Sequence, residues 1–386
     1  MIPYGRQSVS QQDIDAVVEV LRSDWLTQGA VVPRFETAVA DYCGAAHAVA
    51  VNSATSALHI ACLALGVGPG DLVWTSPISF VASSNCARYC GADVDFVDVD
   101  GETANLSPAA LERKLAAAKR NGRLPKVVIP VHLTGQSCDM EAIHALSRRY
   151  GFRIVEDASH AIGGSYRGEP VGNCHYSDIA VFSFHPVKVI TSGEGGMATT
   201  NDAELAGLMA LLRSHGITRE PELLTREPDG PWYYEQLELG YNYRLTDIHA
   251  ALGLSQMARL EAFVRRRNEI AARYDEALGG LPLRPLGRQQ DAYSAYHLYV
   301  VRLDLARLSR SHRDVIVALR DRGIGVNVHY MPIYRQPDYA RFGVNAQDFP
   351  EAERYYGETI SLPLYVDLTE DLQDEVVAAM REVLAP

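Results

Sequence analysis

The sequence of 386 residues is long enough for a large domain and a smaller one, each with its own core. Its hydrophobic content of 47% is ordinary for a globular protein, and its net charge of −12 argues against a general binder of nucleic acid or of anionic membranes. It contains no basic-then-apolar leader, no apolar run of about 18 residues and no spacing typical of a metal site. We therefore expect a cytoplasmic protein with six reduced cysteines, no metal, and no membrane or nucleic-acid partner.

The first half of the chain predicts alternating helices and strands. Ser10 can cap a helix that ends near Arg22, because apolar residues recur there on one face. Further along, the pattern predicts helices at 32–43 and 108–120, and strands at 49–52, 72–75, 94–99, 126–131, 152–157 and 179–184. This alternation indicates an α/β fold with a mostly parallel sheet between layers of helices.

Small and hydroxyl residues follow the first strand, where Ala54, Thr55 and Ser56 open a helix. The first N–H groups of a helix have no acceptor within it, and the helix dipole favours an anion there. The pattern is typical of a phosphate site without a P-loop. A Ser/Thr helix cap with no ligand would explain it too.

A carboxylate pair, Glu156 and Asp157, ends the strand at 152–157. In α/β sheets, ligands bind beyond the carboxyl ends of the strands, so Asp157 is a candidate ligand-binding acid. Taken alone, it could equally be a loop or cap residue.

Lys188 follows the apolar strand at 179–184 and lies within a second apolar run. Lysine is rarely buried without a partner, and desolvation lowers its pKa and frees its amine to attack a carbonyl. The pattern therefore predicts a Schiff-base lysine, with a lysine that snorkels from a strand end as the alternative. Pyridoxal phosphate (PLP) needs such a lysine and also a carboxylate beside its ring nitrogen. Together, Asp157, Ser183, His185 and Lys188 favour a PLP site.

The second half predicts a helix at 204–215, a polar loop at 216–235, a helix at 248–257 and a long charged helix at about 256–278. The run of three arginines at 265–267 is interpreted as a solvated face. Later segments suggest a small α+β unit. We therefore expect a large PLP-binding α/β domain over 1–255 and a smaller α+β domain over 256–386.

Six segments resemble the sugar aminotransferases of the DegT/DnrJ/EryC1/StrS family, a branch of the fold-type I PLP enzymes: 26–29, 52–58, 156–161, 182–188, 240–245 and 328–330. The resemblance runs nearly end to end. It implies the fold-type I transferase architecture, with a mostly parallel seven-stranded sheet, and PLP as cofactor. It also implies a homodimer with shared active sites.

The resemblance also implies roles for individual residues. Lys188 and Asp157 are the expected catalytic groups. The expected cofactor contacts add Ala54, Thr55, Ser56 and Ser183 at the phosphate, Phe80 on the ring, His160 at the ring hydroxyl, and Asn242 reaching the phosphate of the other subunit. The expected substrate contacts are Leu26, Thr27, His185, His329, Tyr330 and Tyr334.

Segments 75–82, 183–188 and 329–334 are most similar to the transaminases of pseudaminic acid biosynthesis. That branch implies transfer of the amino group of L-glutamate to C4 of UDP-2-acetamido-2,6-dideoxy-β-L-arabino-hexos-4-ulose. The products would be 2-oxoglutarate and UDP-4-amino-4,6-dideoxy-N-acetyl-β-L-altrosamine. Family members often carry lysine where this chain has Met331, so Arg335 or Arg6 would have to supply the charge for the substrate diphosphate.

Three alternatives stay open. The first is amination of another keto-sugar nucleotide, linked to dTDP or GDP. The second is the sugar 3-dehydratase branch, which replaces the Schiff-base lysine with histidine and is opposed by Lys188. The third is a non-catalytic PLP-fold sensor. The chain lacks a GxGxxG fingerprint and a GxSxG elbow, which disfavours a nicotinamide enzyme and a serine hydrolase.

Overall fold

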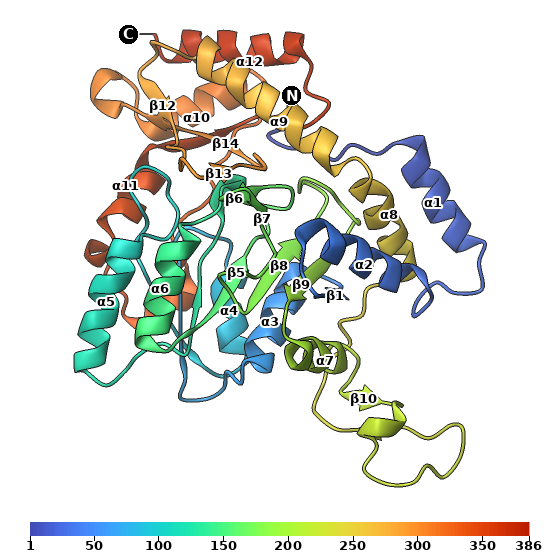
Figure 1. Cartoon of the computed structure of the whole chain (residues 1–386). Helices are drawn as coiled ribbons and strands as arrows, with labels where there is room; N and C mark the ends of the chain where they lie inside the picture. Colours follow the sequence, from blue (N-terminus) through green and yellow to red (C-terminus); the bar gives the residue numbers. More distant parts are fainter. Residues whose placement is uncertain (386) are drawn as a thin grey trace.

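The computed structural model describes residues 1–385 and contains a central seven-stranded sheet in the order β1-β9-β8-β5-β4-β2-β3 (Figure 1). All strands run the same way except β9, which is antiparallel to both of its neighbours. The predicted mostly parallel sheet of seven strands is confirmed. The strands are β1 (His47–Val51), β2 (Leu72–Thr75), β3 (Asp93–Phe96), β4 (Val127–Ile129), β5 (Arg153–Asp157), β8 (Ile179–Ser183) and β9 (Gly196–Thr200).

Helices cover both faces of this sheet because successive strand residues point to opposite sides. On β5, Val155 packs into a core formed with α3 (Ala54–Ala64), α4 (Ala82–Tyr89) and α7 (Ala203–Leu212). Its neighbour Ile154 packs into a core on the other face. The helices of that face are α5 (Pro108–Arg120) and α6 (Met140–Tyr150), with α2 (Val31–Cys43) and α8 (Asp247–Met257) further along the sheet.

The C-terminal part forms an α+β unit around an antiparallel sheet of three strands, β12 (Leu283–Pro285), β14 (Tyr299–Leu303) and β15 (Thr359–Leu362). Its helices are α9 (Leu260–Ala277), α10 (His312–Asp321), α11 (Pro350–Glu358) and α12 (Glu370–Val383). The N-terminal end of the chain joins this unit, because Ile2 pairs with Ile324 and packs in its core. The domain limits of 1–255 and 256–386 stay a prediction.

Of two expectations about the second half, one was confirmed and one was wrong. The separate helices expected at 248–257 and at about 256–278 are α8 and α9, which are joined at Ala258 and Arg259. The arginine run is not a solvated face, because Arg267 is only 1% exposed while Arg265 is exposed. Successive helix residues point in different directions, so Arg267 faces the protein interior while Arg265, two residues away, faces solvent.

The remaining elements are short. The helix α1 (Gln11–Leu21) is capped by Ser10, as predicted, and packs on α8. A small sheet combines β6 (Ser165–Tyr166), β7 (Glu169–Pro170) and β13 (Ala292–Tyr293). Within residues 1–385, no helix combines the length and the apolar character that crossing a membrane requires.

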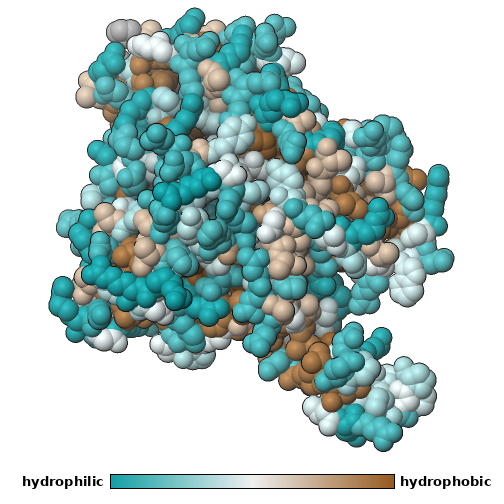
Figure 2. Space-filling view, in the orientation of Figure 1, coloured by the Kyte–Doolittle hydropathy of each residue, from teal (hydrophilic) through white to brown (hydrophobic). Residues whose placement is uncertain are grey.

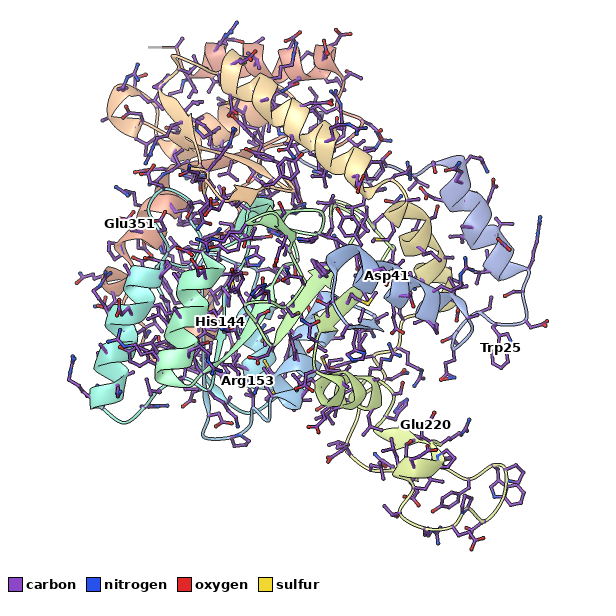
Figure 3. All side chains as sticks on the ribbon, viewed as in Figure 1. Trp25, Asp41, His144, Arg153, Glu220 and Glu351 are labelled. Carbon is purple, nitrogen blue, oxygen red and sulfur yellow. The ribbon has the colours of Figure 1, made fainter. Side chains whose placement is uncertain are left out.

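Between α7 and α8 the chain leaves the body as an arm, residues 217–239, seen at the lower right of Figure 1. Its base is the pair β10 (Ile217–Thr218) and β11 (Glu235–Gln236). Figure 3 shows its side chains, with Glu220 labelled, standing away from the rest of the molecule. Hydrophobic residues gather where the arm joins the body (Figure 2), and four large apolar side chains along it are exposed: Leu223, Trp232, Tyr234 and Leu239.

Candidate active site

A cavity of about 360 Å³ lies at the carboxyl ends of β5 and β8 and beside the start of α3. Its other wall comes from the C-terminal unit, through residues 327–330, and from Tyr4 near the N-terminus. Ten of the predicted site residues line it: Ala54, Thr55, Phe80, Asp157, His160, Ser183, His185, Lys188, His329 and Tyr330.

Lys188 reaches the cavity from the turn that follows β8. Proline at position 186 ends the strand, and the N–H of Lys188 donates to the carbonyl of His185 at 3.0 Å. No side-chain hydrogen bond or ion pair engages its amine within residues 1–385. Burial lowers the pKa of Lys188 to about 8, although the charge of Asp157 acts in the opposite direction. A nucleophilic neutral amine is therefore accessible near neutral pH.

Asp157 ends β5 on the face that carries α4. Its Oδ2 accepts a hydrogen bond from the hydroxyl of Ser83 at 2.6 Å, and its Oδ1 accepts from the N–H of Ser159 at 3.2 Å. Its backbone N–H donates to Pro130, so the end of the strand is held as well. The carboxylate is thus buried, oriented from both sides and directed at the cavity.

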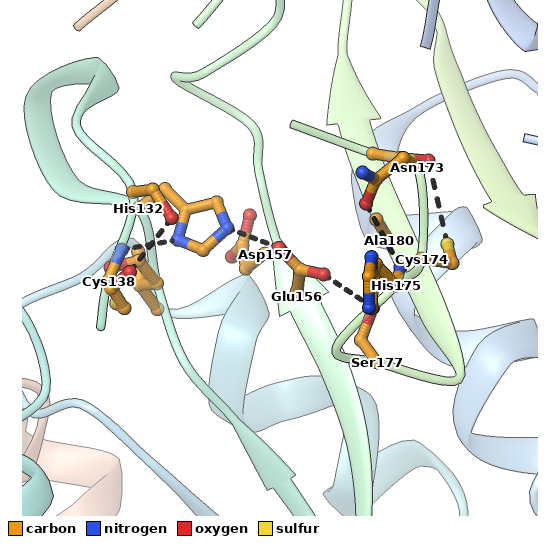
Figure 4. A network of polar contacts seen from close by, with 12 residues as sticks. His132, Cys138, Glu156, Asp157, Asn173, Cys174, His175, Ser177 and Ala180 are labelled. Carbon is orange, nitrogen blue, oxygen red and sulfur yellow. Dashed lines mark hydrogen bonds and ion pairs between the residues drawn. The ribbon is translucent and has the colours of Figure 1, made fainter. Parts of the chain in front are cut away.

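Glu156, the neighbouring carboxylate, points to the opposite face and belongs to a different network (Figure 4). It contacts His132 at 2.6 Å and accepts a hydrogen bond from Ser177 at 2.5 Å. The N–H of Cys138 donates to Nδ1 of His132, so Nε2 carries the hydrogen and donates to Glu156. This closed network anchors the end of β5 and leaves Asp157 as the only one of the two acids in the cavity wall.

The start of α3 lies beside the cavity, and its dipole favours an anion there. Ser53 caps the helix by accepting from the N–H of Ser56, whose own hydroxyl donates to Asn52 at 2.6 Å. Ser56 is therefore used within the helix cap and does not line the cavity, whereas Ala54 and Thr55 do. A Cβ on Gly196 would overlap the backbone of Ser53 and Ala54, so glycine is needed for β9 to lie against this helix start.

Three histidines surround Lys188 on the remaining side: His160, His297 and His329. The rings of His160 and His297 lie 4.3 Å apart, and the hydroxyl of Tyr330 lies 3.3 Å from Nε2 of His160. Burial, together with the nearby Lys188, holds the pKa of His160 well below its usual value and lowers that of His329 to about 4. These rings are therefore neutral, and Nδ1 of both His160 and His297 has no partner among the described residues.

The other predicted site residues lie outside this cavity. Leu26 is 46% exposed, and Thr27 forms a bridge to Thr246. Tyr334 is buried in a core, with its hydroxyl donating to Glu353 at 2.8 Å. Asn242 is exposed, and its hydrogen bonds to other described residues use its backbone, including its carbonyl, which accepts from Asn52.

Several lining residues were not foreseen: Tyr4, Ser53, Ser79, Glu194, His297 and Asn327. Ser53 and Ser79 fall inside segments 52–58 and 75–82, which the sequence analysis names, so their position in the sequence was a usable signal. Tyr4 and His297 had no such signal, because each is far in the chain from the strands that it meets.

The residues present fit PLP. The wall offers an unpartnered amine, an oriented carboxylate, a helix start whose dipole suits a phosphate, and buried ring nitrogens that lack partners. When bound, PLP supplies an electron sink for the carbon that loses a proton.

Comparison with known proteins agrees with this geometry. The model of the DegT/DnrJ/EryC1/StrS aminotransferase family matches residues 7–381. The spore coat polysaccharide biosynthesis protein SpsC of Bacillus subtilis is 40% identical over 387 residues, which cover 99% of this chain and 97% of that protein.

Solved structures are also similar. Helicobacter pylori PseC, an aminotransferase involved in the biosynthesis of pseudoaminic acid, has 32% identity and a TM-score of 0.90, covering 99% of each chain. Spr1654 of Streptococcus pneumoniae in its PLP form has 30% identity and a TM-score of 0.88, covering 99% of this chain and 98% of that one. The family implies a keto nucleotide-sugar substrate and an amino donor. The chain therefore belongs to the DegT/DnrJ/EryC1/StrS aminotransferase family and is a PLP-dependent sugar aminotransferase of fold type I.

Proposed function

We propose that this protein transfers the amino group of L-glutamate to C4 of UDP-2-acetamido-2,6-dideoxy-β-L-arabino-hexos-4-ulose. The product is UDP-4-amino-4,6-dideoxy-N-acetyl-β-L-altrosamine, a precursor of pseudaminic acid. The observation that carries the reaction class is the unpartnered amine of Lys188 beside the oriented carboxylate of Asp157. The likeness to PseC and the motifs at 75–82, 183–188 and 329–334 support the substrate.

Each cavity residue has a chemical task in this proposal. Lys188 would hold PLP through its amine and, as a free amine, would move the proton at Cα of glutamate. Asp157 keeps a proton on the ring nitrogen, and His160 hydrogen-bonds to the ring hydroxyl. The phosphate is bound by Ser183, Thr55 and the N–H of Ala54.

Phe80 packs against the ring, a role supported by its exposed side chain, 59% accessible, at the cavity wall. His185, His329 and Tyr330 bind the sugar portion, which their positions in the same wall support.

We also propose a homodimer in which the partner subunit's Asn242 completes the phosphate site. Asn242 is exposed and does not line the cavity of its own chain. The apolar side chains along the neighbouring arm give a second copy a surface on which to pack. Leu26 and Thr27, which are also outside the cavity, would then lie at the subunit boundary.

The substrate diphosphate needs a positive charge that Met331 does not supply. Arg335 forms an ion pair with Glu353, so its positive charge is already balanced by that carboxylate. Arg6 is exposed and lies two residues from the cavity residue Tyr4. We therefore assign the diphosphate to Arg6, and Tyr334, whose hydroxyl is held by Glu353, to an indirect supporting role.

Amination of a different keto-sugar nucleotide is the second candidate. The 40% identity to SpsC favours it, because that protein is named for spore coat polysaccharide biosynthesis.

Absorbance titration separates these possibilities. We expect the visible band of the PLP-loaded protein to disappear with L-glutamate and to return with the UDP-linked keto-sugar of L-arabino configuration. Its return only with a dTDP- or GDP-linked keto-sugar would retain the reaction and overturn the substrate. An unchanged band in Lys188→Ala would overturn the assignment of Lys188.

A further inference from the structure

Two buried serines form a short chain of hydroxyl groups that ends on Asp157. Ser79 lines the cavity just before α4, and Ser83 lies in the first turn of that helix. Their hydroxyl oxygens are 2.6 Å apart, and Ser83 is 2.6 Å from Oδ2 of Asp157. Ser79 is 4% exposed and Ser83 is fully buried, so water does not compete for these contacts.

The chemistry of the acceptor gives the chain a direction. An ionised carboxylate only accepts hydrogen bonds, so Ser83 must donate its single hydroxyl hydrogen to Asp157. The other acceptor within reach of Ser83, the carbonyl of Phe80, is 3.3 Å away and is the weaker choice. Ser83 therefore accepts a hydrogen bond from the hydroxyl of Ser79. The hydroxyl hydrogen of Ser79 thus points to Ser83 and not into the cavity.

We propose that Ser83 is a positioning residue that fixes the Asp157 carboxylate for its contact with the cofactor ring nitrogen, and that Ser79 orients Ser83. The proposal rests on the proposed role of Asp157. Ser83 on Oδ2 and the N–H of Ser159 on Oδ1 hold the carboxylate from both sides. The fixed carboxylate presents its remaining lone pairs to the ring nitrogen, and it loses less orientational freedom when the cofactor binds than an unheld carboxylate would.

The test compares Ser83→Ala with a matched control on the same helix. Ser84 is equally buried, but its hydroxyl contacts Tyr339 and not Asp157. Ser84→Ala therefore removes the same group from the same helix without touching the chain of hydroxyls. The two readouts are steady-state kinetics and the nitrogen-15 NMR resonance of ring-labelled PLP bound to the protein, which reports how completely the ring nitrogen is protonated.

For Ser83→Ala we expect kcat to fall about tenfold to a hundredfold, with the KM for L-glutamate little changed, because a hydrogen bond to a charged group is lost. The ring nitrogen resonance should move toward that of the unprotonated ring. Ser83→Thr retains a hydroxyl, so its kcat and its ring nitrogen resonance should both be close to those of the wild type. Ser84→Ala should resemble the wild type in both measurements. A Ser83→Ala resonance identical to that of the wild type would overturn the proposal, as would an equal change in Ser84→Ala.

Asp157→Asn separates this proposal from the function on which it rests. If Asp157→Asn leaves the ring resonance unchanged, the role of Asp157 is overturned. If Asp157→Asn shifts the resonance and Ser83→Ala does not, only the positioning role of Ser83 is overturned.

A double variant tests the place of Ser79 in the chain. Ser79→Ala should lower kcat by a few-fold in the wild type and have almost no further effect in Ser83→Ala, because neighbouring groups that act through one another are not additive. Equal effects in both backgrounds would show that Ser79 acts independently of Ser83.

Discussion

Two cationic side chains in different regions of the molecule, the half-buried Lys188 and the fully buried Arg267, differ in whether their charge has hydrogen-bond acceptors. Lys188, in the turn after β8, lines the cavity and has no hydrogen-bonding partner for its amine among the described residues, and burial lowers its pKa to about 8. Arg267, on α9 where the two parts of the chain meet, is 1% exposed. Its guanidinium donates to the carbonyls of Tyr296, His297 and Leu364 at 3.1 to 3.4 Å.

The difference shows that burial alone does not make a cation reactive. Burial also lowers the pKa of Arg267, to about 10, but three carbonyl acceptors hold its charge, so the residue joins α9 to two loops. The amine of Lys188 lacks such acceptors and is left available for chemistry. The distinction can be tested by changing each residue and measuring both activity and stability.

The largest expected effect is the loss of activity in Lys188→Ala and Lys188→Arg. Both should lower amination by about 10³-fold or more, because neither retains an amine that can bond to PLP or transfer the proton. The arginine variant keeps the charge, so activity in it would show that charge rather than nucleophilicity matters. Circular dichroism checks that both variants fold.

Arg267→Met should lower the free energy of unfolding by about 3 kcal/mol, because three buried carbonyls lose their donor. Urea denaturation measures this change. Arg265→Ala, on the exposed face of the same helix, is the matched control and should change stability by less than about 0.5 kcal/mol. Equal losses in the two variants would contradict the structural role of Arg267.

Arg267→Lys should cost less than Arg267→Met, about 1 kcal/mol, because lysine keeps the charge, although its shorter side chain does not extend to the position of Nη1, which makes all three carbonyl contacts. A loss as large as that of Arg267→Met in the same urea experiment would mean that the shape of the guanidinium, rather than its charge, carries the whole effect.

The smallest effect concerns pH. The neutral amine captures PLP, so the capture rate of the protein freed of cofactor should rise about tenfold per pH unit below the pKa of Lys188 and level off above about 8. The charge of Asp157 raises that pKa, so Asp157→Asn should move the midpoint to lower pH. Stopped-flow absorbance measures the profile, and a midpoint near the ordinary lysine value would show that Lys188 is not desolvated.

The sequence by itself determined the local elements and the presence of Lys188 and Asp157 in one cavity. Ser10 caps a helix, strand 72–75 lies where predicted, and the residues that end β5 and β8 meet in one cavity, because the carboxyl ends of neighbouring parallel strands share an edge. The position of Ala54 and Thr55 at the cavity wall could also be predicted, because it depends on one strand-to-helix junction.

Only the tertiary structure decided which other residues line the cavity and which arginine of the run at 265–267 is buried. Tyr4 and His297 reach the cavity, and Tyr334 is turned into a core, through packing between segments that are more than a hundred residues apart. Arg267 and Arg265 belong to the same charged run, yet only the packing of α9 against the loops at 296–297 and 364 buries one of them. Local periodicity sets which residues share a face of an element, whereas the partner of that face comes from elsewhere in the chain.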